Sequence, residues 1–149
     1  GPPFWKADAR AAFLGINAST TKKQIVRAAL ESVAFQMVVY LEFLQRDNKF
    51  ELKNLIVDGG MIKNKLFLQM IADLLKIEIM VPDIEEMSLY GALLFGIQHQ
   101  KKISELSDLN KYAVKRKTIK CHKNQGILRS YQNWKKLIDI HFISNQEKN

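Results

Sequence analysis

The sequence has little cysteine, proline or glycine, and each scarcity excludes a class of protein. Cys121 is the single cysteine among 149 residues, so the chain cannot form an internal disulfide and cannot fill a structural zinc site alone. Three prolines and seven glycines are too few for a collagen-like or low-complexity chain. We therefore expect a folded domain in a reducing compartment, and specifically in the cytoplasm.

Long apolar runs are also missing from the sequence. Charged or amide residues interrupt every stretch before it reaches the roughly 18 apolar residues that a membrane span needs, and the first residues lack the pattern of a signal peptide. The hydrophobic fraction of 47% and the charged fraction of 26% are typical of soluble globular domains. A chain of this length can bury about 68–70% of the surface that it exposes when unfolded, so we expect one well-formed core and no membrane partner.

Positive charge is concentrated in the last third of the chain. Residues 1–100 hold eleven basic and eleven acidic side chains, whereas residues 101–149 hold twelve basic and four acidic ones, which accounts for the whole net charge of +8. Such a basic segment could bind nucleic-acid phosphates or an acidic partner. No nucleic-acid-binding motif accompanies the charge, so a solvated basic surface is the favoured interpretation and nucleic acid is not an expected partner.

The strongest periodicity predicts a helix over residues 22–46, after several possible capping residues at 17–21. Apolar residues outside its main stripe, such as Val26 and Phe43, predict that this helix is buried on more than one side. Ahead of it, residues 11–16 are predicted to form a short strand.

The middle of the chain predicts a βαβα unit. Residues 52–57 and 77–81 are β-branched apolar runs, and Pro82 stops the second. Asn64 is expected to cap the helix between them, and Ser88 to cap a third helix. This order indicates an α/β fold whose local sheet is largely parallel, with helices packed on its faces.

Beyond residue 100 the patterns are shorter. Residues 104–112 are predicted to form a short helix, residues 113–121 to be extended and exposed, and residues 125–143 to form a last amphipathic helix. We divide the chain accordingly into residues 1–100 and a basic segment, 101–149, whose terminal helix is expected to pack on the same domain.

The most informative local feature is the pair Gly59-Gly60, which follows a predicted strand and precedes a predicted helix. Ligands of α/β sheets bind at the carboxyl ends of strands. Glycines permit positive φ and close approach of a ligand to the backbone, and the amide of Asn64 can donate and accept hydrogen bonds. A plain turn would explain the glycines equally well, and Asp58 is interpreted as a turn residue that bonds its own backbone.

Two further glycines, Gly91 and Gly96, fall inside the third predicted helix. Glycine within a helix costs about 0.5–1 kcal/mol relative to alanine, so something is expected to approach closely there. Packing against the Gly59-Gly60 turn is favoured over contact with a ligand.

The remaining titratable residues predict neither a catalytic set nor a metal site. His99, His122 and His141 are scattered and lack partners at metal-ligand spacing. Glu85 and Glu86 are adjacent and therefore diverge in direction. Phosphate-binding, nucleophile-elbow and zincin motifs are absent from the sequence.

Five short motifs, in order and in register, resemble the carboxy-terminal domain of FGGY-type carbohydrate kinases. The resemblance is strong from the first residue to about Gln98 and looser through residues 133–136. Ala11 and Lys6 depart from the residues common in the family, which indicates a diverged member. The motifs are Pro3-Phe4-Trp5, Asp8-Ala9-Arg10, residues 27–36, Val57-Asp58-Gly59-Gly60 with Asn64, and Ser88-Leu89-Tyr90-Gly91-Ala92.

The resemblance implies an actin-like ATPase, or ribonuclease-H-like, fold in which two domains close around ATP and a second substrate. This chain would be most of the second domain. The family's glycine turn and following asparagine hold the adenosine part of ATP, which implies binding by Gly60 and Asn64 with Gly59 supporting the turn. The helix that begins near Ser88 would pack behind that pocket.

The implied reaction is phosphoryl transfer from ATP to glycerol or a related polyol, with Mg²⁺ as the metal. The family's catalytic aspartate, polyol-binding residues and phosphate loops match no position here, so this chain alone is expected to be inactive. Another sugar kinase of the family, a binding module for nucleic acid or acidic partners, and a catalytically silent scaffold are the alternatives. Self-association is left open.

Overall fold

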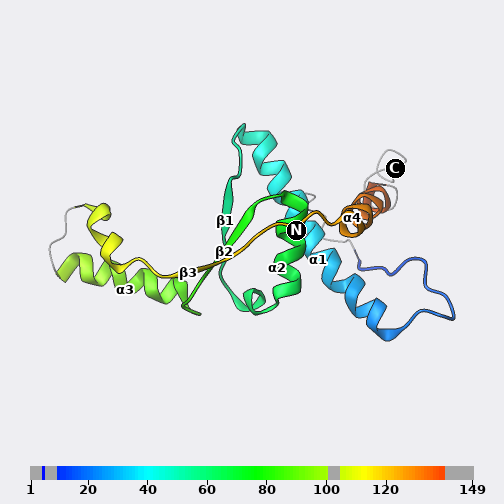
Figure 1. Cartoon of the computed structure of the whole chain (residues 1–149), viewed down its shortest axis with the longest axis horizontal. Coiled ribbons are helices and arrows are strands. Elements are labelled where there is room, and N and C mark those ends of the chain that lie inside the picture. The colour runs from blue at the N-terminus through cyan, green and yellow to red at the C-terminus, as the bar shows by residue number, and fades with distance from the viewer. Residues whose placement is uncertain (1–4, 6–9, 101–104, 140–149) are drawn as a thin grey trace.

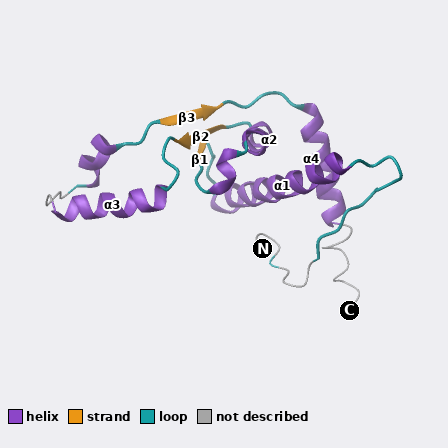
Figure 2. Cartoon of the chain, turned by 90° about the horizontal axis from the view of Figure 1, so that it is seen from below, coloured by secondary structure: helices purple, strands orange, loops and turns teal. Residues whose placement is uncertain are grey.

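The computed structural model describes residues 5, 10–100 and 105–139. Three strands form one sheet near the middle of the molecule, α1 and α2 lie on the same side of it, and α3 with η2 projects away from it (Figure 1, Figure 2). The elements, where η denotes a 3-10 helix, are α1 (Lys22–Asn48), β1 (Asn54–Ile56), η1 (Gly60–Lys63), α2 (Lys65–Leu75), β2 (Glu78–Pro82), α3 (Met87–Gln100), η2 (Leu106–Tyr112), β3 (Arg116–Ile119) and α4 (Gln125–Ile138).

The sheet has the order β1-β2-β3 and combines both pairing directions. β1 and β2 are parallel, with Leu55 opposite Ile79, so the predicted βαβ unit is confirmed. β3 lies antiparallel to β2, with Ile119 opposite Ile79. Residues 116–119 are extended and largely exposed as expected, but their pairing with β2 was not foreseen, because three of the four residues are polar and show no strand alternation.

The core is built around α2, whose whole inner side is buried. α2 packs against β2 and β3, and both α1 and α4 pack against α2. These elements enclose one cluster of apolar side chains, whose fully or nearly buried members include Val38, Phe67, Met70, Ile71 and Ile79. Each large apolar side chain removed from water contributes about 1.5–3 kcal/mol, so this cluster is the main source of stability.

An aromatic cluster joins α1 to α4. The ring centroids of Phe35 and Tyr131 are 5.4 Å apart, and those of Phe35 and Trp134 are 5.7 Å apart. The Tyr131 hydroxyl donates to Glu42 Oε2 at 2.8 Å. Burial and this hydrogen bond to a carboxylate both raise the pKa of Tyr131. The amphipathic helix predicted over 125–143 is thus present up to residue 138, and residues 140–143 lie outside the described residues.

A buried carboxylate, Asp73, ties the loop between β3 and α4 to α2. Asp73 Oδ1 accepts from Gln69 Nε2 at 2.7 Å and from the backbone N–H of His122 at 2.8 Å. Asp73 Oδ2 accepts from Asn124 Nδ2 at 3.3 Å, and Asn124 in turn caps α4 by accepting from the Ile127 N–H. The same side chain therefore anchors the loop and the residue that starts the last helix.

α1 begins as predicted but is less buried than predicted. Thr21 caps it through a reciprocal pair of bonds with Gln24. Only one narrow side, which includes Phe35, is buried, and Val26 on the other side is 60% exposed, so the expectation of burial on more than one side is wrong for this chain. By length and composition alone α1 could cross a bilayer, with a mean hydropathy of 1.2 over 18 residues, although core helices of globular domains pass the same criterion.

Three local expectations are corrected by the structure. Residues 11–16 form no strand. Ser88 does not cap α3, because the helix already begins at Met87 and the Tyr90 N–H donates to Glu86 O at 3.0 Å. α3 does not pack on the sheet: none of its residues is buried, and it packs chiefly against η2, where the Tyr90 hydroxyl donates to Tyr112 O at 2.5 Å.

Candidate functional site

The glycine turn is positioned by the end of β1. The Val57 N–H donates to Met80 O at 3.1 Å, which keeps the chain beside β2 for one residue past the strand. Gly59 then adopts φ 99° and ψ 174°, a backbone conformation that is accessible essentially only to glycine. Gly60 starts η1, whose end is closed by a bond from Asn64 N to Met61 O at 3.0 Å. The turn therefore depends on the missing side chain at Gly59.

The turn is open. A Cβ atom added at Gly59 or at Gly60 would meet no atom within 4 Å among the described residues, and both glycines are exposed. Gly60, unlike Gly59, has no positive φ. The two glycines therefore differ in role. The backbone conformation at position 59 requires glycine, whereas the absence of a side chain at Gly60 leaves an open space that no other described residue fills.

Asn64 has the capping role that the sequence predicts. Its Oδ1 accepts from the Phe67 N–H at 3.0 Å, which fixes the start of α2. With the oxygen committed to the cap, the amide nitrogen is the group that can donate to a ligand. The first N–H groups of α2 and the positive end of the helix dipole lie at the same place, which favours electron-rich ligand atoms.

The loop that follows β2 lies at the same edge of the sheet as the glycine turn, because β1 and β2 are parallel. Two ion pairs anchor this loop. Lys63 Nζ at the end of η1 lies 3.1 Å from Glu85 Oε1, and Lys117 Nζ on β3 lies 2.6 Å from Asp83 Oδ1. The hydrogen bond from Lys117, together with its charge, lowers the pKa of Asp83. The loop is therefore held on one side to the turn and on the other to β3.

The sequence predicted that Gly91 and Gly96 lie against the glycine turn, and this is wrong. A Cβ atom at either position would meet no described atom within 4 Å, because α3 extends away from the sheet (Figure 1). Gly59, Gly60 and Asn64 are brought together as expected, within one turn and the start of one helix.

Within residues 5, 10–100 and 105–139, no group of three or more His, Cys, Asp or Glu side chains could hold a metal ion. His122 Nδ1 lies 4.0 Å from Asp73 Oδ1 as part of the loop anchor. Cys121 is exposed. His141 lies outside the described residues.

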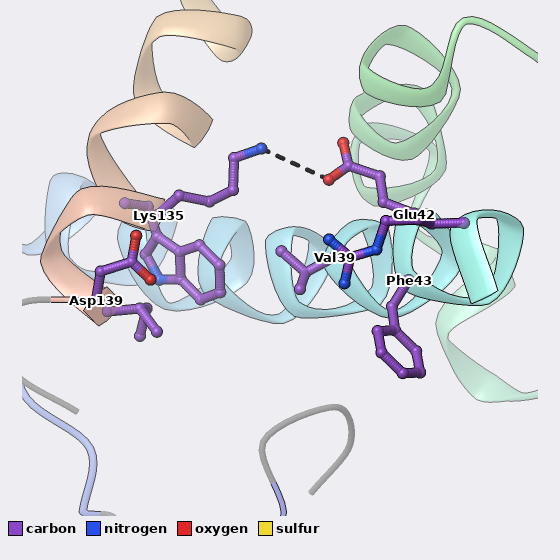
Figure 3. Close-up of a pocket in the computed structure, with 8 residues that line it drawn as sticks. Val39, Glu42, Phe43, Lys135 and Asp139 are labelled. Carbon is purple, nitrogen blue, oxygen red and sulfur yellow. Dashed lines mark ion pairs between the residues drawn. The ribbon is translucent and has the colours of Figure 1, made fainter. Parts of the chain in front are cut away.

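A hollow of about 540 Å³ lies between α1 and α4 and was not predicted (Figure 3). The side chain of Lys135 crosses this hollow, and its Nζ atom lies 3.5 Å from Glu42 Oε2. Sequence patterns could not reveal it, because it exists only where the two helices meet. Its walls are Val39, Glu42, Phe43, Arg46, Trp134, Lys135, Ile138 and Asp139.

Comparison with known proteins identifies the fold. A solved structure of xylulose kinase from Lactobacillus acidophilus superposes with a TM-score of 0.75 over 95% of this chain, at 18% identity. The chain therefore has the fold of the carboxy-terminal part of an actin-like ATPase, as the sequence predicts. Residues 1–98 match the FGGY family of carbohydrate kinases, C-terminal domain, and the chain belongs to that family.

Glycerol kinases are among its most similar relatives. Glycerol kinase 1 of Thermotoga maritima is 32% identical over 139 residues, which is 93% of this chain and 28% of that protein. Glycerol kinase of Deinococcus radiodurans is 46% identical over 92 residues, 62% of this chain and 18% of that protein. A crystal structure of Plasmodium falciparum glycerol kinase with ADP superposes with a TM-score of 0.80, at 29% identity, over 95% of this chain and 29% of that one. The chain thus spans less than a third of the relatives that it matches.

Proposed function

We propose that this chain supplies the adenosine-binding part of an ATP-dependent kinase that phosphorylates glycerol to glycerol 3-phosphate. The observation that carries the proposal is the open turn at Gly59 and Gly60, placed at the carboxyl end of β1 and directly before the capped start of α2. Ligands of α/β sheets bind at such strand ends.

The chemistry of the turn suits a nucleoside. Exposed backbone at Gly60 permits a flat base or a ribose to lie against the chain without meeting a side chain. The amide nitrogen of Asn64 can donate to a ring nitrogen or a hydroxyl and so fix the orientation of the nucleoside. The ADP named with the Plasmodium falciparum glycerol kinase structure supports the same ligand class for this chain.

Phosphates and Mg²⁺ fit this chain less well than the nucleoside does. Phosphoryl transfer needs a positioned base, a metal and groups that hold the phosphates. The part of the chain that the structure describes presents no carboxylate cluster for the metal. We therefore propose that the residues present here bind and orient adenosine, that Mg²⁺ neutralises phosphate charge through groups elsewhere in the enzyme, and that this chain alone does not turn over.

Glycerol as the acceptor is supported by the names of two similar relatives, which are both glycerol kinases. Another sugar or polyol of the family is the alternative. We also propose that residues 1–100 and 101–149 belong to one domain, supported by the pairing of β3 with β2 and by the packing of α4 against α1. A cytoplasmic setting is part of the proposal, supported by the exposed thiol of Cys121.

The substitution Gly60→Val tests the site. Because a side chain at Gly60 meets open space, the fold should be unaffected, while the new methyl groups occupy the proposed nucleoside seat and should abolish binding of ADP and ATP. Isothermal titration calorimetry on the purified chain measures this directly. Gly96→Val is the matched control, since Gly96 also faces open space but lies on α3. Unchanged ADP affinity in the Gly60 variant, or no ADP binding by the unsubstituted chain, would refute the assignment.

A further inference from the structure

An ion pair borders the proposed nucleoside seat. Lys63 stands between Gly60 and Asn64 in the chain, and its Nζ atom lies 3.1 Å from Oε1 of Glu85 in the loop after β2. Both side chains are mostly exposed, at 68% and 75%. The pair therefore joins the two loops that follow the parallel strands, at the edge of the sheet where the nucleoside is proposed to bind.

We propose that Lys63 and Glu85 form a positioning pair that holds the turn at residues 59–63 in its binding shape. The inference rests on the proposed function. A turn that contains two glycines has many accessible conformations when it is unrestrained. Its own hydrogen bonds are the local ones from Ile62 N to Gly59 O and from Asn64 N to Met61 O. A contact to the neighbouring loop reduces the conformational freedom that a ligand must otherwise remove on binding.

The pair acts through the turn and not by contact with the nucleotide phosphates, and the two roles predict opposite results. An exposed ion pair contributes little, so its loss should weaken binding by about two- to fivefold. If the pair positions the turn, the loss is the same for uncharged adenosine and for ADP. If Lys63 bound the phosphates instead, removing the carboxylate of Glu85 would release the ammonium group, and ADP would bind more tightly.

The test measures the dissociation constants of adenosine and ADP by calorimetry. Lys63→Met and Glu85→Gln are each expected to weaken both ligands about two- to fivefold, and the charge-exchanged chain K63E/E85K is expected to recover most of the affinity. Glu31→Gln is the matched control. It breaks the ion pair between Glu31 and Arg27 within α1, which joins neither of the two loops. That substitution should leave both dissociation constants unchanged.

Equal or tighter ADP binding by the Glu85→Gln chain would overturn this inference, as would a loss confined to ADP or a failure of the exchanged pair to recover affinity. None of these outcomes would refute the proposal that a nucleoside binds at Gly59 and Gly60. The proposed function fails separately, if Gly60→Val leaves ADP binding intact.

Discussion

Replacing Asp73 with alanine should loosen α4 and its loop from the rest of the molecule. The substitution removes the acceptor of three hydrogen bonds, from Gln69 at 2.7 Å, from the His122 N–H at 2.8 Å and from Asn124 at 3.3 Å. The carboxylate side chain is almost fully buried, with 2% of its surface exposed. The His122 N–H and the Asn124 amide would have to find water or move, whereas Gln69 Nε2 keeps its hydrogen bond to Lys120 O at 2.9 Å.

The magnitude follows from the kind of bond that is lost. A hydrogen bond to a charged group contributes about 1.5–3 kcal/mol, and a buried neutral donor that is left without a partner costs about 1–3 kcal/mol. The loop at His122 is exposed and can be rehydrated after the bond is lost, which favours the lower end. We therefore expect a loss of about 3 kcal/mol, a large part of the 5–15 kcal/mol that stabilises a typical domain. The isosteric Asp73→Asn keeps one acceptor and should lose about 1–2 kcal/mol.

Urea unfolding followed by circular dichroism measures this loss. With a typical slope of about 1–3 kcal/mol per molar urea, the midpoint should fall by about 1–3 M in the alanine variant. Hydrogen exchange should also quicken in α4 more than in α2, because the anchored loop carries the cap of α4. Asp83→Asn, at an exposed carboxylate, is the control and should shift the midpoint little. An alanine midpoint within the error of the unsubstituted chain would refute the anchoring role.

Three further outcomes are expected. Gly59→Ala should lose about 1–3 kcal/mol of unfolding free energy through backbone strain, whereas Gly60→Ala should change it little, and a reversed order in urea unfolding would contradict the assignment of their roles. Asn64→Ala should lose about 0.5–2 kcal/mol as a helix cap, and it should also weaken ADP binding by about 1–3 kcal/mol in calorimetry; intact affinity would leave Asn64 a cap alone. Because the pKa of Tyr131 is raised in the folded state, stability should fall as pH rises above its unfolded value of about 10, and Tyr131→Phe should flatten that fall in urea midpoints taken from pH 9 to 11.

Local patterns in the sequence predicted the elements that build the candidate site. The β-branched runs around residues 52–57 and 77–81, together with Asn64 between them, are sufficient to specify a parallel strand pair joined by a capped helix. The same reasoning located Gly59 and Gly60 at the carboxyl end of β1, and the resemblance to the family agrees with the comparisons. Binding of adenosine there stays a prediction.

Expectations about burial failed where a local pattern does not say which surface is covered. The first helix was expected to be buried on more than one side and the third to pack on the sheet, yet Val26 on α1 and Phe95 on α3 are 60% and 68% exposed. The sequence pattern indicates that one face of a helix is apolar, but which element covers that face depends on the tertiary structure. For β3 the reverse holds, because its polar residues carry no strand signal and only its pairing with β2 makes it a strand.

The projecting arm of α3 and η2 leaves the sheet after Pro82 and returns to it at Arg116, and these two residues face each other in adjacent antiparallel strands. In topological terms residues 83–115 are an oversized hairpin connection. Because the entropy of closing a loop grows only slowly with its length, the part of this connection beyond Glu85 can be extended or exchanged without altering the register of β2 and β3. The arm is therefore the natural place to graft a foreign segment onto this scaffold, with both junctions already held together by the sheet.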